Sequence, residues 1–189
     1  MNTNFIFKQR KRATQLEQWL ISMQKKGRYI YGRHFSLPSH NRQILYLLFI
    51  YSTGNKEAIA SVGMDPVKGI LLIGGKKSGK TALLHLMRFF VTEKKRYHLR
   101  SCKELVLNPK LSLDLIVQSN QNVGYCLDDL GNEKVTYRNG SSKELFHEVL
   151  LLCQQKAIWV HATSSLSLNA LNKRYNLRVE DVFNVLKIK

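Results

Sequence analysis

The stretch GGKKSGKT, at residues 74–81, holds the residues with the most specific chemistry in this sequence. Its spacing fits the pattern G-x-x-x-x-G-K-[ST], with Gly74, Gly79, Lys80 and Thr81 in the fixed places. Both glycines allow backbone angles that a side chain would forbid, so that backbone N–H groups can converge on phosphate oxygens. We expect Lys80 to reach the β- and γ-phosphates of a nucleotide, and the Thr81 hydroxyl to hold Mg²⁺.

The sequence on either side of this loop favours phosphate binding over a chance match in a glycine turn. Residues 70–73 (ILLI) are typical of a buried parallel strand, and residues 81–90 repeat apolar side chains at helical spacing. A strand, a loop and a helix in this order are the context that the motif requires. The predicted nucleotide contacts are Gly74, Gly75, Lys76, Lys77, Ser78, Gly79, Lys80, Thr81 and Ala82.

Two acids, Asp128 and Asp129, follow an apolar run about fifty residues after the loop. Parallel α/β sheets bring such strand ends beside the phosphate site. There, Asp128 can hold Mg²⁺ through its waters, and Asp129 can orient or deprotonate an attacking water. The alternative is that the pair serves as a helix cap or a turn.

Later polar residues are weaker candidates for the same site. Thr163, Ser164 and Ser165 end the next apolar run, where a hydroxyl could contact the γ-phosphate or the attacking water, although such residues are as often caps. Arg174 and Arg178 could stabilise the charge of phosphoryl transfer, often from a neighbouring subunit, or could only be solvated. Thr163 and Arg178 join Lys80 and Asp129 as the predicted catalytic residues.

Strands that alternate with helices must hold these residues together. Beyond residues 70–73, strands are expected around 97–100, 122–131, 157–165 and 182–189, with helices at 41–54, 81–90, 141–157 and 167–175. This order predicts an α/β domain over residues 41–189, with a five-stranded parallel sheet covered by helices on both faces. His161 and Trp159 lie in an apolar run and are expected in the core.

Residues 1–40 form a separate basic extension in this prediction. Residues 1–42 carry nine Lys or Arg but one acid, Glu17, and the whole chain has a net charge of +17. The charge favours nucleic acid, as single-stranded or double-stranded DNA, over an anionic membrane or mere solubility. Leu16, Trp19, Leu20 and Met23 share one helical face, which we expect to pack on the main domain or on a partner protein. Residues 27–40 are predicted to be an extended connector.

Other features indicate a cytoplasmic protein. The longest apolar run, at residues 44–51, is too short to span a bilayer, and no apolar stretch with a cleavage site follows the basic N-terminus. Cys102, Cys126 and Cys153 are far apart and odd in number, which is typical of free buried thiols. Their spacing does not suit zinc.

Together, these segments resemble the DnaC/IstB-like group of AAA+ ATPases, which are helicase loaders and transposition helper proteins. The resemblance covers residues 40–188 and depends on NRQIL (41–45), KGILLIGGKKSGKT (68–81), CLDDLGNE (126–133), HATSSLSLNALNKRY (161–175) and LRVEDVFNVLKI (177–188). It implies that Lys80 and Thr81 are the Walker A pair, that Asp128 and Asp129 are the Walker B pair, that residues 163–165 are sensor 1, and that Arg178 is the arginine finger.

The resemblance also implies ATP and Mg²⁺ as ligands, homo-oligomers formed with nucleotide or DNA, and a replicative helicase, transposase or recombinase as partner. This chain departs from the group: it has Thr163-Ser164-Ser165 for T-T-N and Tyr175-Asn176-Leu177-Arg178 for Y-G-x-R, and it lacks most of a C-terminal lid. Two functions therefore stay open, an ATPase that is slow without DNA or partner, and an ATP- and DNA-binding adaptor that barely hydrolyses. A small-molecule kinase is a third possibility, for which no acceptor-binding segment is visible.

Overall fold

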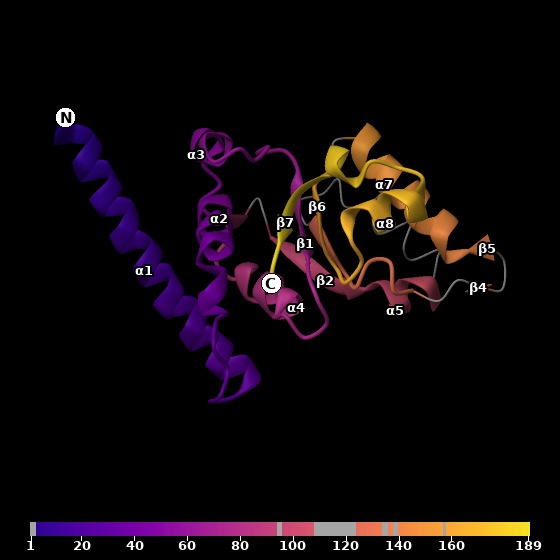
Figure 1. Ribbon diagram of the computed structural model, residues 1–189, viewed down its shortest axis with the longest axis horizontal. Coiled ribbons are helices and arrows are strands. Elements are labelled where there is room, and N and C mark those ends of the chain that lie inside the picture. Colours follow the sequence, from indigo (N-terminus) through magenta and orange to yellow (C-terminus); the bar gives the residue numbers. More distant parts are fainter. Residues whose placement is uncertain (1–2, 94–95, 108–123, 134–135, 138–139, 157) are drawn as a thin grey trace.

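The computed structural model describes residues 3–93, 96–107, 124–133, 136–137, 140–156 and 158–189 (Figure 1). The first part of the chain forms α1 (Thr3–Tyr31), η1 (Ser39–Asn41), α2 (Arg42–Ser52), α3 (Lys56–Ser61), β1 (Gly69–Ile73), α4 (Lys80–Met87), β2 (Tyr97–Ser101) and α5 (Cys102–Leu107). The second part forms β3 (Gly124–Asp128), β4 (Thr136–Tyr137), β5 (Gly140–Ser141), α7 (Ser142–Gln155), β6 (Val160–Ser164), α8 (Leu168–Tyr175), η4 (Val179–Asp181) and β7 (Phe183–Lys187).

Five parallel strands form the main sheet, in the order β2-β3-β6-β1-β7. The α/β class and the five-stranded parallel sheet are confirmed. β3, β6 and β7 lie within predicted segments, and β1 and β2 each extend one residue beyond theirs, to Gly69 and Ser101; residues 122, 123 and 157 of the predicted segments lie outside the described residues. The small hairpin β4–β5 was not predicted, because strands of two residues carry no readable periodicity.

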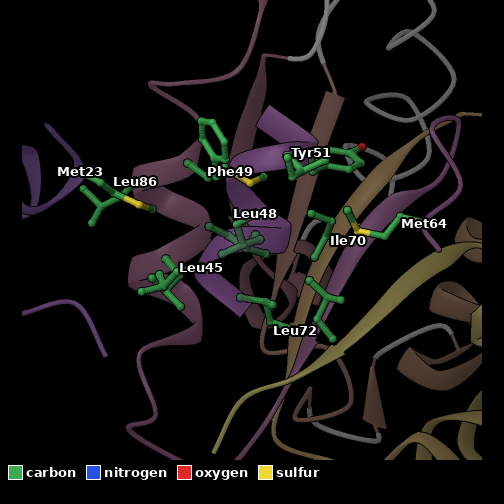
Figure 2. Close-up of a cluster of buried hydrophobic side chains, with 14 of the residues drawn as sticks. Met23, Leu45, Leu48, Phe49, Tyr51, Met64, Ile70, Leu72 and Leu86 are labelled. Atoms are coloured by element: carbon green, nitrogen blue, oxygen red, sulfur yellow. The ribbon is translucent and has the colours of Figure 1, made fainter. Parts of the chain in front are cut away.

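The strand β1, between β6 and β7, is buried on both faces, which explains its unbroken apolar sequence. Ile70 and Leu72 pack with α1, α2, α3 and α4 in one cluster, and Leu71 and Ile73 pack with α5, α7 and α8 in the other. Figure 2 shows part of the first cluster, in which Met23, Leu45 and Leu86 come from three helices and Ile70 and Leu72 come from β1. Helices therefore cover both faces of the sheet, as predicted.

The helix α1 packs on the domain through its C-terminal half, while its N-terminal end extends away from the sheet (Figure 1). Met23 is fully buried, and Trp19 contacts the rings of Phe49 and Phe90, each at 5.9 Å between centroids. The apolar stripe of α1 was predicted to pack on the main domain or on a partner protein, and in the structure it packs on the main domain.

The prediction of an extended connector from residue 27 was wrong for residues 27–31, which continue the helix. Gly27 lies inside α1 and does not break the helix. A Cβ there would stand 2.1 Å from the ring of Phe35, so glycine allows this close packing. The helix ends at Gly32, whose φ is +95°. The side chain of Gln24 then holds the returning segment, since it accepts from the Leu37 N–H at 2.8 Å.

Two predictions about the core are confirmed. Cys102, Cys126 and Cys153 are free and buried, and burial raises the pKa of each thiol. His161 is buried, and its Nδ1 accepts a hydrogen bond from the backbone N–H of Ile70 at 2.9 Å.

Candidate functional site

The loop between β1 and α4 is shaped by two glycines with different duties. Gly79 precedes α4 with a φ of +88°, the left-handed angle that the sequence predicted. Gly74 does not have such an angle, and that expectation was wrong. Instead, a Cβ at Gly74 would stand 2.4 Å from the backbone oxygen of Ile188, so only glycine fits beside β7.

The ammonium group of Lys80 lies inside the loop. Its Nζ donates to the carbonyl oxygens of Gly74 at 2.9 Å and Gly75 at 2.7 Å, and lies 3.4 Å from the hydroxyl of Ser78. Lys80 is 6% exposed, and this burial lowers its pKa, while the charges of Asp129 and Asp128 raise it. A buried cation held by neutral carbonyls is well placed to attract an anion.

Asp128 joins three elements at the carboxyl end of the sheet. Its Oδ1 accepts hydrogen bonds from the hydroxyls of Thr81 on α4 and Thr163 on β6, each at 2.7 Å. These oxygens suit a hard cation such as Mg²⁺. In the described part of the chain, no three His, Cys, Asp or Glu side chains gather as a metal site, so a magnesium ion here would also need phosphate oxygens and water.

Asp129 adopts a left-handed backbone angle, with a φ of +66°, which is unusual for a residue other than glycine. Its N–H donates to the Thr163 hydroxyl at 2.9 Å, and its Oδ1 accepts from the Asn132 amide at 3.0 Å. Asn132 also donates to the hydroxyl of Ser165 at 2.7 Å. Thr163 thus orients both acids, and Asn132 bridges the ends of β3 and β6.

These groups open onto a pocket of about 440 Å³. It is lined by Tyr31, Lys76, Lys77, Gly79, Lys80, Thr81, Ala82, Asp129, Asn132 and Ser165. Sequence reasoning missed two of these residues. Tyr31 is the last residue of α1, and its hydroxyl lies 2.5 Å from Nδ1 of His85. Asn132 follows the two acids in the sequence CLDDLGNE, residues 126–133. Of the predicted hydroxyls, Ser164 faces away and donates to the Leu130 carbonyl at 2.6 Å.

The two candidate arginines occupy different surroundings. Arg178 is exposed, precedes η4 and does not line the pocket. Arg174 forms an ion pair with the buried Glu133, with 2.9 Å between Nη2 and Oε1. The hydroxyl of Tyr175 donates to the same oxygen at 2.7 Å, and the N–H of Gly131 donates to Oε2 at 2.7 Å. Arg174 is therefore part of the protein's own structure.

Solved structures share this architecture. The structure of the DnaC helicase loader is 21% identical, with a TM-score of 0.58, over 83% of this chain and 94% of that one. DnaI is 19% identical, with a TM-score of 0.54, over 82% and 86% of the two chains. This protein has a DnaC-like AAA+ fold. AMPPCP-bound DnaA from Aquifex aeolicus matches at 16% identity and a TM-score of 0.51, over 82% of this chain and 48% of that one.

No protein-family model matches the sequence, and no curated protein matches it either. The AAA+ fold therefore rests on the shape of the chain and on the resemblance of its motifs. Among the described residues, no helix combines the length and the apolar character needed to cross a membrane.

Proposed function

We propose that this protein binds Mg-ATP in the pocket beside Lys80 and hydrolyses it slowly, acting on DNA as a helicase-loader-like or transposition-helper-like ATPase. The observation that carries the proposal is the convergence of Lys80, Thr81, Asp128 and Asp129 at one edge of the sheet. A cation, a hydroxyl and two carboxylates are the groups that nucleotide hydrolysis requires.

Each residue then has a distinct duty. Lys80 and the N–H groups of the loop bind the β- and γ-phosphates, and Thr81 with Asp128 holds Mg²⁺, which neutralises phosphate charge when bound. Asp129, oriented by Asn132, directs a water to the γ-phosphorus and receives its proton, while the bond to the β-phosphate oxygen breaks and ADP leaves.

DNA and a protein partner are proposed on two grounds. A neighbour in structure is a helicase loader, and a net charge of +17 favours a polyanion. Arg178 is exposed and does not line the pocket of its own chain, which supports oligomers in which it completes a neighbour's site. A cytoplasmic location goes with this role.

The second candidate is an adaptor that binds ATP and DNA but barely hydrolyses. In the described part of the chain, the cations that line the pocket are lysines and none is an arginine. A chain that never meets a neighbouring Arg178 would then hold ATP without cleaving it.

The deciding experiment measures Mg-ATP binding and turnover by the wild type, Lys80→Ala and Lys56→Ala, with and without single-stranded DNA. Lys56 is an exposed lysine on α3 and serves as the matched control. We expect Lys80→Ala alone to lose ATP binding, and DNA to raise wild-type turnover. Normal binding by Lys80→Ala would refute the site, and binding without turnover in any condition would select the adaptor.

A further inference from the structure

A second hollow lies between α1 and the segment that follows α4. Its volume is about 500 Å³, and it is lined by Ser22, Lys25, Lys26, Tyr29, Phe89 and Phe90. None of these described residues lines the nucleotide pocket. We refer to this set of six residues as the α1–α4 hollow.

The α1–α4 hollow presents aromatic rings to solvent together with cations. Tyr29 is 84% exposed and Phe89 is 43% exposed. Nζ of Lys26 lies 4.4 Å from the ring centre of Phe89 and 5.2 Å from that of Tyr29, and the Arg88 guanidinium lies 4.7 Å from the Phe89 ring. Neighbouring exposed rings mark interaction sites, and here two groups, the Lys26 ammonium and the Arg88 guanidinium, hold positive charge against their faces.

The helix α1 provides this surface because its two faces differ. Trp19 and Met23 point into the core, whereas Ser22, Lys26 and Tyr29 recur at helical spacing on the side that lines the hollow. Phe90 contacts Trp19, so the floor of the hollow is continuous with the buried core. The platform is therefore held in place before any ligand arrives.

We infer that the α1–α4 hollow binds single-stranded nucleic acid. Unpaired bases stack on exposed aromatic rings irrespective of sequence, and neighbouring lysines contact the phosphates. No carboxylate lines the hollow among the described residues, and the net charge of the chain suits a polyanion. An apolar protein segment fits less well, because it would cover Lys25 and Lys26 without supplying negative charge for them. The inference deepens the DNA-binding part of the proposed function but does not depend on ATP hydrolysis.

The test measures fluorescence anisotropy of labelled oligothymidine without nucleotide, over a range of salt. We expect Tyr29→Ala and Phe89→Ala to weaken binding by about tenfold at every salt concentration, because each loses a stacking surface. Lys26→Gln should lower the slope of log affinity against log salt by about 0.7, the value for one phosphate contact on a single strand. Tyr29→Phe, which keeps the ring, and Lys56→Gln, on a distant helix, should bind like the wild type.

Wild-type binding by both Tyr29→Ala and Phe89→Ala, with unchanged melting temperatures, would overturn the site. Loss of binding to anionic vesicles or to an acidic peptide in these variants, with oligothymidine binding intact, would overturn the ligand class. Lys80→Ala separates the two proposals: it should bind oligothymidine normally even though its ATP site is lost, so failure of one proposal does not imply failure of the other.

Discussion

Three carboxylates lie within residues 128–133, and they differ in the groups that bind them and in their burial. Asp128 and Asp129 accept hydrogen bonds from hydroxyl and amide groups, which carry no charge, and Asp129 lines an open pocket. Glu133 has a fully buried side chain, and both of its oxygens are bound by the chain itself.

The difference lies in where each negative charge is neutralised. Glu133 is neutralised by Arg174. Burial, followed by the charge of Glu133, raises the pKa of the adjacent Tyr175 hydroxyl, and the hydrogen bond with Arg174 lowers it. Asp128 and Asp129 are oriented by neutral donors and keep their charge for a ligand. A carboxylate that forms an ion pair with a side chain of its own protein stabilises the fold. A carboxylate without such an ion pair can act on a ligand.

The largest expected effect separates the two groups by turnover. Asp129→Asn should lower kcat for ATP by at least about 100-fold, because the variant cannot accept a proton from water, while the KM changes little. Glu133→Gln should keep the kcat of each folded molecule and lose stability instead. Steady-state kinetics on samples corrected for folded fraction measures both, and equal losses of kcat would remove the distinction.

The next effect separates the two arginines by stability. Arg174→Ala leaves the buried Glu133 without its cation, and should lower the free energy of unfolding by about 3 kcal/mol. Arg178→Ala removes an exposed side chain and should change it by less than about 0.5 kcal/mol. Urea unfolding of both variants tests this contrast, which a similar loss in Arg178→Ala would contradict. For turnover we expect the opposite order: the kcat of each folded molecule should be lower in Arg178→Ala than in Arg174→Ala.

A smaller effect tests how Asp128 and Asp129 are oriented. Thr163→Val keeps the volume but cannot donate to Asp128 or accept from the N–H of Asp129. We expect about a tenfold loss of apparent Mg²⁺ affinity in the turnover assay, as for other residues that orient a metal ligand. Thr163→Ser restores the hydroxyl and should recover most of the affinity. A Thr163→Val enzyme with normal magnesium dependence would leave Thr163 with a packing role only.

The smallest effect concerns His85, whose Nδ1 lies 2.5 Å from the hydroxyl of the pocket residue Tyr31. Burial lowers its pKa, and so does the charge of Arg88, so unfolded chains bind the proton more readily than folded ones. Its contribution to stability is therefore present above the ordinary histidine pKa of about 6.5 and lost as the pH falls below it. His85→Gln should flatten the fall in melting temperature between about pH 7 and pH 5. His98→Gln, on an exposed strand position, is the control, and an unchanged slope in His85→Gln would contradict the assignment.

Local patterns predicted the fold and the strand–loop–helix order around residues 74–81. Strands, helices and the G-x-x-x-x-G-K-T spacing are properties of neighbouring residues, and each of the five strands overlaps a segment that the apolar runs predicted, with ends that differ by up to three residues. Contacts between distant segments were not visible. Spacing alone could not tell that Arg174 reaches Glu133 while Arg178 does not, because Arg174 lies in the last turn of α8 and only three residues separate it from Arg178.

Tyr31 was missed for a related reason. Gly27 and Gly32 stand close together in the sequence and suggest a break, but only Gly32 ends the helix, because Phe35 folds back over Gly27. That packing is a tertiary contact, and it carries α1 one turn further, to the edge of the pocket. The role of Asn132 likewise depends on β6, since its amide reaches Ser165.

The strand β1 sits between β6 and β7, which both come from the last thirty or so residues of the sequence. Ile73 accepts a hydrogen bond from the N–H of Ile188, whose own oxygen packs against Gly74 at the start of the phosphate loop. During synthesis, the loop emerges from the ribosome long before the strands that hold it. The nascent chain must therefore keep one edge of the apolar strand β1, beside the start of the phosphate loop, without its partner until β7 has been added.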